Sequence, residues 1–400
     1  MFSSVLPEHS INSIIKQFSN PTPKDVTIDV GAGSVTSITR IVSGVYQMGL
    51  GDISSLVEFN AQNPGTPLVQ ALYQYYNRAP FVIIGRKDRG ITTDFRSLEG
   101  KKIAAAAVES TRRAWPVVAR KLGLKPDLFA WSTTDFSARD NVLVRGDVDG
   151  ATYFHDSAVS LFSRMKPDEV SVLQYANAGV NLYGNAILAS SSMIAQNPKL
   201  VAGFLRASNR AIVETFANPL PAIAATKQRE PILDEKVELD RWNLTAQYVG
   251  APDTCGHGIG DIRKLVLEQQ VDEVVEVFGL KSKPSADGLF NLAMLPPKAE
   301  RAVKSRWINH LPPTISTRRM AATFFKPSPG HAPPARRATG RLALSSSPQT
   351  AACWPRRIAT RPRPVIARVT QKPTPYALCP KASAARFLRM RRFTRLVSLA

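Results

Sequence analysis

Short apolar runs alternate with amphipathic segments along residues 26–270, and this alternation constrains the fold more than any other feature of the chain. The runs at 26–30, 46–49 and 67–74 have the length and composition of strands. Between the first two runs, apolar residues from Val35 to Val45 recur with the spacing of one helical face. Such an alternation predicts an α/β fold with mostly parallel strands.

A second unit of the same kind follows the continuous apolar run at 79–86. The patterns predict further strands at 102–108, 149–153, 170–174 and 185–189, a helix at 110–122, and mainly helix from 198 to about 270. Residues 88–183 are therefore expected to form lobe two, inserted into a lobe one made of 26–87 and 184–300. Two crossing strands, near 80–87 and 184–190, would join the lobes. Since ligands of open α/β sheets bind beyond the carboxyl ends of strands, a ligand cleft is expected between the lobes.

The net charge of +21 comes entirely from the last hundred residues. Residues 301–400 contain 21 Lys and Arg and no Asp or Glu, whereas residues 1–300 contain 31 basic and 31 acidic side chains. Thirteen prolines between 311 and 380 and the absence of sustained periodicity predict a disordered, Pro/Arg-rich tail. A basic arm that grips phosphates and a read-through or frame-shifted terminus are both open interpretations. Residues 1–300, which we call the body, are therefore expected to carry the function, and no specific nucleic-acid partner is predicted.

The amino-terminal segment 1–25 is atypical, because it has no cationic start followed by an apolar run of signal-peptide length. No other stretch reaches the roughly 18 apolar residues that span a bilayer. As written, the chain would stay cytoplasmic. Its three cysteines, an odd number, predict no disulfide framework.

Turns that follow the predicted strands of lobe one carry the first candidate ligand-binding residues. Gly33 and Ser34 open one helix, and Asp52, Ser54 and Ser55 open the next. Backbone N–H groups at such turns can hold an anionic or carbonyl oxygen, although the same side chains also serve as helix caps. Gly31, Gly33 and the later Asp52 also suggest a dinucleotide fingerprint, but Thr36 stands where its third glycine would be. No cofactor is predicted.

Further candidates lie before the first crossing strand and in lobe two. Gln74 and Asn77, within a Tyr-rich run, could hydrogen-bond the edge of a heterocycle. The remaining candidates follow strands of lobe two or open the returning crossover: Ser110, Thr111, Arg112, Tyr153, Tyr183 and Asn185. Among them, the guanidinium group of Arg112 suits an oxyanion.

Two other groupings carry no predicted chemistry. His155 beside Asp156 resembles an acid/base pair, but no motif places a nucleophile with it. Cys255 and His257 have no second Cys or His pair, so no metal site is predicted. No catalytic residue is predicted, and the body is expected to be monomeric.

The order of these motifs resembles the substrate-binding proteins of ABC importers for nitrate, sulfonates, taurine and thiamine-pyrimidine precursors. The similarity rests on VTIDVGAGS at 26–34, MGLGDISSL at 48–56, LEGK at 98–101, GDVDG at 146–150, LYGNAILA at 182–189 and the segment 197–207. It implies the type II periplasmic binding protein fold, periplasmic location, a membrane permease as partner, and capture of a small molecule by hinge closure. Members of the group begin with an export signal, a first strand and a helix, which residues 1–25 do not supply.

The resemblance also implies rivals to a transport role. Fungal relatives of the thiamine-pyrimidine branch are enzymes that use pyridoxal phosphate as a substrate. They carry a Cys-rich signature, and residues 1–254 contain no cysteine. A truncated remnant that cannot fold lobe one is the other alternative. The expected ligand is a pyrimidine-type heterocycle or a sulfonate-like oxyanion, and the chain is expected not to be an enzyme.

Overall fold

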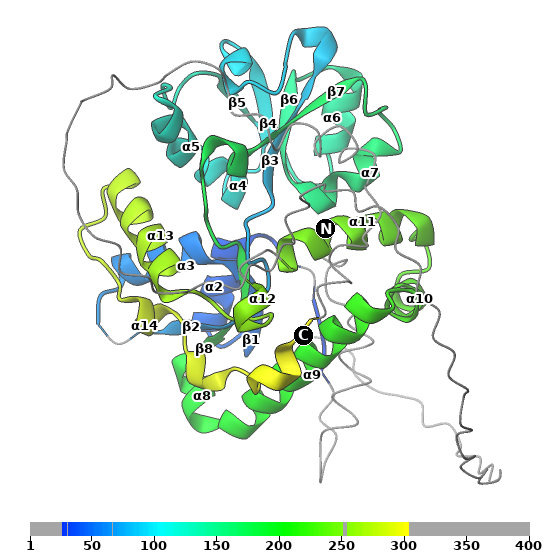
Figure 1. Cartoon of the computed structure of the whole chain (residues 1–400). Helices are drawn as coiled ribbons and strands as arrows, with labels where there is room; N and C mark the ends of the chain where they lie inside the picture. Colours follow the sequence, from blue (N-terminus) through cyan, green and yellow to red (C-terminus); the bar gives the residue numbers. More distant parts are fainter. Residues whose placement is uncertain (1–25, 30, 66, 251–253, 304–400) are drawn as a thin grey trace, which may run out of the picture. The chain divides into compact units, whose positions relative to one another are not determined.

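The computed structural model describes residues 26–303 except 30, 66 and 251–253. The predicted tail and most of the atypical segment 1–25 therefore lie outside the described residues. The first elements, drawn in blue in Figure 1, belong to lobe one, which we define as the three-stranded sheet and the helices packed on it: α2 (Ser34–Val42), β1 (Met48–Asp52), α3 (Ile53–Gln62) and β2 (Val69–Gln74).

The chain then crosses to lobe two, defined as the five-stranded sheet and its helices. Its elements are β3 (Phe81–Arg86), β4 (Lys102–Ala105), α4 (Ser110–Arg113), α5 (Trp115–Leu122), β5 (Ala130–Thr133), α6 (Arg139–Arg145), β6 (Gly150–Phe154), α7 (Val159–Phe162) and β7 (Val170–Gln174).

After β7 the chain returns to lobe one and becomes helical. The elements are β8 (Asn185–Ser190), α8 (Ser191–Gln196), α9 (Pro198–Ala217), α10 (Leu220–Arg229), α11 (Glu235–Val249), α12 (Thr254–His257), α13 (Lys264–Val277) and α14 (Ala286–Leu289). None of the described helices is both long enough and apolar enough to cross a membrane.

The strand directions correct the prediction of mostly parallel sheets. Lobe one has the order β1-β8-β2 with both pairings antiparallel, and lobe two has the order β5-β4-β6-β3-β7. In the described sheets, parallel pairing is confined to β4 with β5 and β6, while β3 runs antiparallel to β6 and β7. The reason is that β3 and β8 each enter their sheet from the other lobe, so they run against their neighbours. The predicted lobe boundaries stay a prediction, although β3 pairs wholly within lobe two.

The strand predicted at 26–30 is wrong. Residues 26–29 have no regular structure, and residue 30 lies outside the described residues. A strand needs a neighbouring backbone to pair with, and here side chains from other parts of the chain contact this segment instead. Arg229 Nη2 donates to the Ile28 carbonyl (2.7 Å), and the Tyr46 hydroxyl donates to Asp29 Oδ2 (2.7 Å).

Three apolar cores follow from the layered arrangement. One lies between the lobe one sheet and the helices α2, α3, α13 and α14, with Ile38, Leu56 and Leu267 at most 1% exposed. A second extends from the opposite face of that sheet, under α9 and α11, into lobe two around Trp115. The third fills the far face of the lobe two sheet under α6 and α7. Burial of this apolar surface is the main stabilising term.

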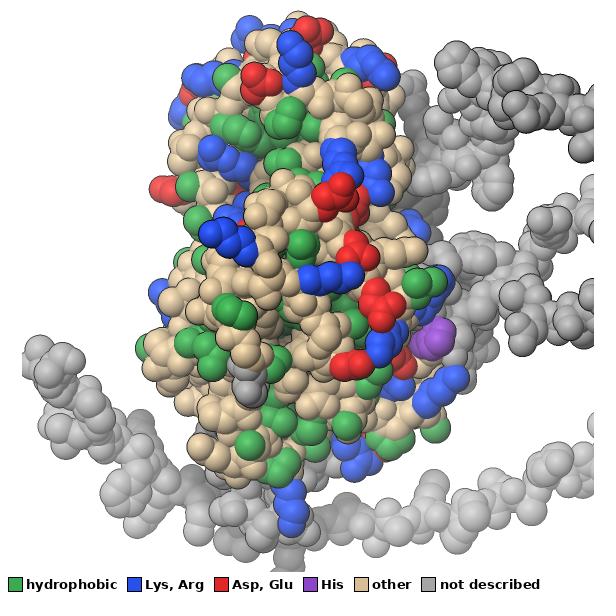
Figure 2. Space-filling model, turned by 90° about the vertical axis from the view of Figure 1, so that its left-hand side faces the viewer, with side chains coloured by type: hydrophobic (Ala, Val, Ile, Leu, Met, Phe, Trp, Pro, Cys, Tyr) green, Lys and Arg blue, Asp and Glu red, His purple; other side chains and the backbone are tan. Residues whose placement is uncertain are grey.

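Charged side chains also connect the lobes at the surface. Arg120 and Lys121 of α5 pair with Glu276 and Glu273 of α13, the second pair at 2.8 Å. On the face shown in Figure 2, positive and negative side chains lie near one another, and no wide area of one sign is present. The mixture agrees with the balanced charge of residues 1–300.

The two crossings between the lobes are hydrogen-bonded to each other. The Ala79 N–H donates to the Leu182 carbonyl (2.8 Å), and the Gly184 N–H donates to the Tyr76 carbonyl (3.0 Å). Gly184 allows this approach, because a Cβ there would lie 3.0 Å from Tyr76 Cβ and 3.2 Å from Ala79 Cα. We call these two segments, 76–80 and 182–184, the hinge.

Candidate ligand-binding site

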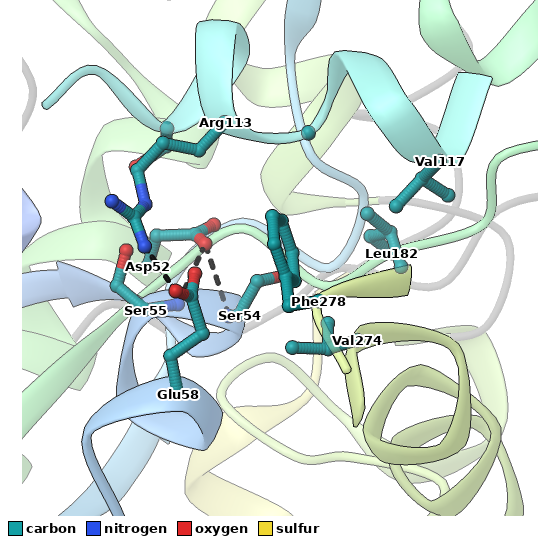
Figure 3. Close-up of a pocket in the computed structure, with 11 residues that line it drawn as sticks. Asp52, Ser54, Ser55, Glu58, Arg113, Val117, Leu182, Val274 and Phe278 are labelled. Atoms are coloured by element: carbon teal, nitrogen blue, oxygen red, sulfur yellow. Dashed lines mark hydrogen bonds and ion pairs between the residues drawn. The ribbon is translucent and has the colours of Figure 1, made fainter. Parts of the chain in front are cut away.

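A small pocket lies where α3 of lobe one meets α4 and α5 of lobe two (Figure 3). Its empty volume is about 250 Å³, counting the open mouth. Polar side chains line one side and apolar ones the other: Asp52, Ser54, Ser55, Glu58, Ser110, Arg113, Ala114, Val117, Leu182, Val274 and Phe278.

Asp52 occupies the turn from β1 to α3 and is 1% exposed. As the N-cap of α3 it accepts hydrogen bonds at Oδ1 from the backbone N–H groups of Ser54 (3.0 Å) and Ser55 (3.3 Å). These contacts satisfy two of the donors that a helix leaves free at its start. Its second oxygen, Oδ2, has no hydrogen-bond partner among the described residues. Asp52 thus caps a helix and leaves one acceptor without a partner at the pocket. Its contact with a ligand stays a prediction.

Ser34 and Ser110 meet across the lobes. Ser34 begins α2 after Gly33, whose φ of +103° favours glycine, and its Oγ lies 3.2 Å from Ser110 Oγ at the start of α4. Ser34 Oγ also accepts from the Asp52 backbone N–H (3.0 Å). Both serines are 7% exposed. Two predicted turns, 76 residues apart in the chain, are therefore joined beside the pocket, which Ser110 lines and Ser34 does not.

An ion pair between Glu58 and Arg113 also joins the lobes at this pocket. Glu58 lies one turn into α3 and Arg113 ends α4, and Figure 3 shows the guanidinium pointing toward the carboxylate. The Glu58 side chain is 8% exposed and the Arg113 side chain 32%. Arg113 Nε is buried and has no partner among the described residues. The positive charge that faces the pocket is therefore compensated within the protein.

Burial raises the pKa of both pocket carboxyl groups. The pKa of Asp52 rises to about 7, because burial outweighs the two backbone N–H groups that lower it, and the charge of Glu58 adds to the rise. Burial also raises the pKa of Glu58, against the opposing effect of Arg113. Asp52 can therefore change its charge near neutral pH.

We expect Asp52 to make the protein less stable as the pH rises from about 4 to about 7. The folded-state pKa of about 7 lies above the ordinary value of 3.8, so the folded state holds a proton that the unfolded state has lost. The stabilising contribution is fully present below pH 4 and is lost as the pH rises through 7.

Urea unfolding of the full chain and of Asp52→Asn across this pH range measures the effect. The difference in unfolding free energy between the two proteins should change steadily from pH 4 to pH 7. Asp234→Asn is the matched control, since Asp234 caps α11 in the same way but is exposed. A difference for Asp52→Asn that stays constant with pH would contradict this assignment.

Gln74, Asn77, Tyr183 and Asn185 lie near the hinge and do not line the pocket. The Gln74 amide nitrogen donates to the carbonyl groups of Tyr76 (2.8 Å), Gly184 (3.1 Å) and Asn185 (3.2 Å), so it braces the crossing segments. Asn185 stands opposite Asp52 in the β1–β8 register. Tyr183 is packed in the core and accepts from the Arg263 N–H (2.8 Å). Their contact with a ligand stays a prediction.

Thr111, Arg112 and Tyr153 also lie outside the pocket lining. Thr111 is fully buried and donates to the Tyr153 carbonyl (3.4 Å). Arg112 turns to the lobe two surface, where it donates to Thr133 Oγ1 (3.1 Å) and lies over the Trp131 ring at 5.1 Å. The Tyr153 hydroxyl donates to Asp140 (2.8 Å). Their predicted ligand contacts likewise stay predictions, while Ser110 of the same segment reaches the pocket.

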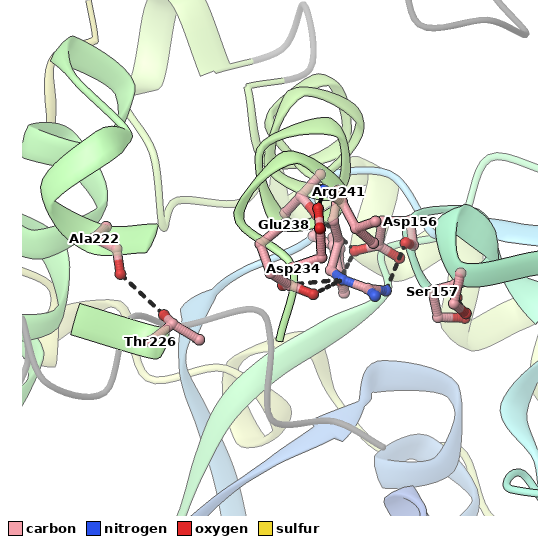
Figure 4. Close-up of polar contacts among 11 residues, drawn as sticks. Asp156, Ser157, Ala222, Thr226, Asp234, Glu238 and Arg241 are labelled. Atoms are coloured by element: carbon pink, nitrogen blue, oxygen red, sulfur yellow. Dashed lines mark hydrogen bonds and ion pairs between the residues drawn. The ribbon is translucent and has the colours of Figure 1, made fainter. Parts of the chain in front are cut away.

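A second buried polar cluster holds α11 against lobe two. Asp156 Oδ2 accepts from the Tyr76 hydroxyl (2.5 Å) and from Thr245 Oγ1 (2.7 Å). Arg241, which also pairs with Glu238, donates to the Asp156 carbonyl (3.0 Å), as Figure 4 shows. These contacts give Asp156 a structural role beside the hinge.

The His155 side chain packs against α11. Its Nδ1 lies 2.7 Å from the Tyr248 hydroxyl, and the residue is 1% exposed. Burial lowers its pKa to about 4, so the imidazole is neutral near pH 7. Among the described residues, no group of three or more His, Cys, Asp or Glu side chains is placed to hold a metal ion.

The pocket includes residues that the sequence did not single out. Glu58, Val274 and Phe278 lie on helical faces that look like ordinary amphipathic helix, and Val117 and Leu182 look like core. Arg113 also lines the pocket, whereas its neighbour Arg112 does not, and this difference depends on which way α4 faces. Only the carboxylate of Glu58 inside an otherwise buried face could have served as a signal.

Comparison with known proteins agrees with this geometry. Two α/β lobes, joined by two crossings and meeting at a small pocket, define the type II periplasmic binding protein fold. A solved structure with this fold is the alkanesulfonate-binding protein from Xanthomonas axonopodis pv. citri bound to MOPS. It matches with a TM-score of 0.56 and 14% identity, over 71% of this chain and 92% of that one.

Residues 25–222 match the family described as NMT1/THI5 like. One curated relative is the 4-amino-5-hydroxymethyl-2-methylpyrimidine phosphate synthase of Aspergillus parasiticus, 27% identical over 54% of this chain and 61% of the relative. Another is the riboflavin-binding protein of Chloroflexus aurantiacus, 35% identical over 29% of this chain and 33% of the relative. The matches span less than two thirds of either relative.

Proposed function

We propose that this chain captures a small molecule between its two lobes and delivers it to the membrane permease of an ABC importer, in the periplasm. The observation that supports this most is the meeting of side chains from both lobes at one pocket, through Ser34 with Ser110 and Glu58 with Arg113. A ligand that contacts both sides is bound best when the lobes are closed, so it shifts the population toward closure. No bond is made or broken in this role.

Two classes of ligand suit a site of this kind, a pyrimidine-type heterocycle and a sulfonate-like oxyanion. The apolar wall of Val274 and Phe278 suits the face of a planar ring, and the hydroxyl groups of Ser34 and Ser110 suit either class. The named relatives bind or make heterocycles, whereas the solved structure binds an alkanesulfonate.

A thermal-shift screen of the full chain tests the proposal. A ligand that binds only the folded state raises the melting temperature, and at a concentration of 100 times Kd it adds about 2.7 kcal/mol of stability. The panel contains pyrimidines, riboflavin, alkanesulfonates and taurine. Small-angle scattering with and without the best ligand then measures closure as a smaller radius of gyration.

We expect Ser110→Ala to weaken the best ligand about two- to twelvefold, because a lost hydrogen bond costs about 0.5–1.5 kcal/mol. Ser171→Ala is the matched control. That serine is also buried in lobe two and donates to the Ile91 carbonyl (2.9 Å), outside the pocket. Equal affinities for the two variants, measured by calorimetry, would count against this pocket, and no shift with any compound would count against capture itself.

A biosynthetic enzyme is the second candidate, supported by the match to the Aspergillus pyrimidine phosphate synthase. The lack of cysteine in residues 1–254 weighs against the Cys-rich enzyme type. Mass spectrometry of the chain incubated with pyridoxal phosphate separates the two roles. Release of a pyrimidine phosphate would establish the enzyme, and unchanged pyridoxal phosphate would leave the binding role.

A further inference from the structure

Two buried polar atoms of the pocket have no hydrogen-bond partner among the described residues, and they differ in kind. Asp52 Oδ2 is an acceptor at the lobe one side, and Arg113 Nε is a donor at the lobe two side. Buried polar groups without a partner are costly, and a ligand or a water molecule that pairs with them removes that cost. The pocket therefore offers one acceptor and one donor from opposite lobes.

The charges around the pocket do not favour an anion. Among the described residues that line the pocket, Arg113 is the one with a positive charge, and Glu58 pairs with it. Asp52 adds a second carboxyl group beside them. The N–H groups of Ser54 and Ser55, which could otherwise hold an oxyanion, already donate to Asp52. Arg112, the predicted partner of an oxyanion, lies at the surface against Thr133 and Trp131.

An oxyanion in this pocket would thus lose its hydration without meeting an uncompensated positive charge. Burial of a charge is favourable only when the charge is paired. An uncharged ligand avoids that cost. If it carries a donor beside an acceptor, it can bind Asp52 Oδ2 and Arg113 Nε together.

We infer that the pocket selects a small uncharged ligand with an N–H or O–H donor next to an acceptor, and that Glu58 is the residue that excludes oxyanions. This inference rests on the proposed capture function and narrows its ligand class. The volume of about 250 Å³ counts the open mouth, so it is an upper limit, and the ligand can be no larger than about a single ring. The apolar side formed by Val117, Leu182 and Phe278 suits one face of such a ring.

Glu58 acts on the ligand through Arg113, so it sets specificity without needing to touch the ligand. Its carboxylate occupies one side of the guanidinium, where an oxyanion would otherwise bind with two parallel hydrogen bonds. Replacing Glu58 by glutamine keeps the size and a hydrogen-bond acceptor and removes the charge. Arg113 then becomes an uncompensated cation facing the pocket.

Calorimetry on the full chain with two probes tests the inference. Cytosine is the uncharged ring with a donor next to an acceptor, and methanesulfonate is the small oxyanion. We expect the natural protein to bind cytosine at least tenfold more tightly than methanesulfonate. Glu58→Gln should tighten methanesulfonate binding at least tenfold and change cytosine binding much less.

Glu276→Gln is the matched control. Glu276 also pairs with an arginine of the other lobe, Arg120, but it lies outside the pocket lining and is exposed. This variant should leave the affinities of both probes unchanged. If Glu276→Gln tightened methanesulfonate as much as Glu58→Gln did, the effect would come from the general charge of the protein, and the role of Glu58 would be lost.

The remaining outcomes separate this inference from the function on which it rests. Methanesulfonate binding by the natural protein that equals or exceeds cytosine binding would overturn the ligand class and support capture. If neither probe binds either protein, the inference fails, and the wider thermal-shift panel decides on capture by itself. If Glu58→Gln does not fold, the comparison of the two probes on the natural protein still decides the ligand class.

Discussion

Replacing Arg139 with alanine is expected to lower the free energy of unfolding by about 3–5 kcal/mol, the cost of leaving a buried charge without its partner. Arg139 Nη1 donates to Glu109 Oε1 at 2.9 Å, and the side chains are 7% and 3% exposed. Glu109 also accepts from Thr152 Oγ1 (2.8 Å). Burial already raises the pKa of Glu109, and Arg139 is the largest influence that lowers it. Without Arg139 the carboxylate must stay buried alone or take up a proton.

Urea unfolding of the full chain at pH 7 measures this loss. Arg145→Ala is the control on the same helix, α6, since Arg145 forms an exposed ion pair with Asp147. Exposed pairs contribute at most about 1 kcal/mol, so this variant should unfold almost as the natural protein does. The double change of Glu109→Gln with Arg139→Met should recover much of the loss. Equal destabilisation by Arg139→Ala and Arg145→Ala would contradict the assignment.

Replacing Trp115 with alanine should destabilise the fold by about 3–5 kcal/mol, the usual cost of removing a buried aromatic side chain. Trp115 is 1% exposed at the start of α5. Its ring centroid lies 4.6 Å from that of Phe129 and 6.2 Å from that of Phe95. Its Nε1 donates to the Pro126 carbonyl (2.8 Å). The change would leave both a cavity and a carbonyl without its donor.

Trp131 provides the comparison for this second variant. It contacts the same Phe129 ring at 4.7 Å but is only partly buried on β5. Trp131→Ala should therefore cost clearly less in thermal or urea unfolding of the full chain. If the two variants lost the same stability, the core of lobe two would not be centred on Trp115.

The sequence predicted most strands of the two lobes because their apolar runs match what a buried strand requires. The runs at 170–174 and 185–189 agree closely with β7 and β8. Strand direction was not predictable in the same way, since apolar composition does not tell which lobe a strand enters from. The run at 26–30 shows the other limit, because an apolar alternation forms no strand unless a neighbouring strand is there to pair with it.

At the site, turn chemistry was the informative signal. Ser34, Asp52 and Ser110 open helices, and helix starts that face a common cleft come together in space. Glu58 and Phe278 could not be found in this way, because their helices carry the usual amphipathic pattern and only tertiary packing shows which face meets the other lobe. Arg112 illustrates the same limit, because it lies at the surface while Arg113, the next residue of α4, lines the pocket.

The pairing of the two crossing segments restricts how the lobes can move. A single linker would leave one lobe free to twist and slide against the other. Here residues 76–80 and 182–184 lie side by side, tied by the Ala79 and Gly184 hydrogen bonds. We therefore expect rotation about this paired segment to be the main relative motion of the lobes. The distance between two probes, one on each lobe, should then be enough to follow the opening of the pocket.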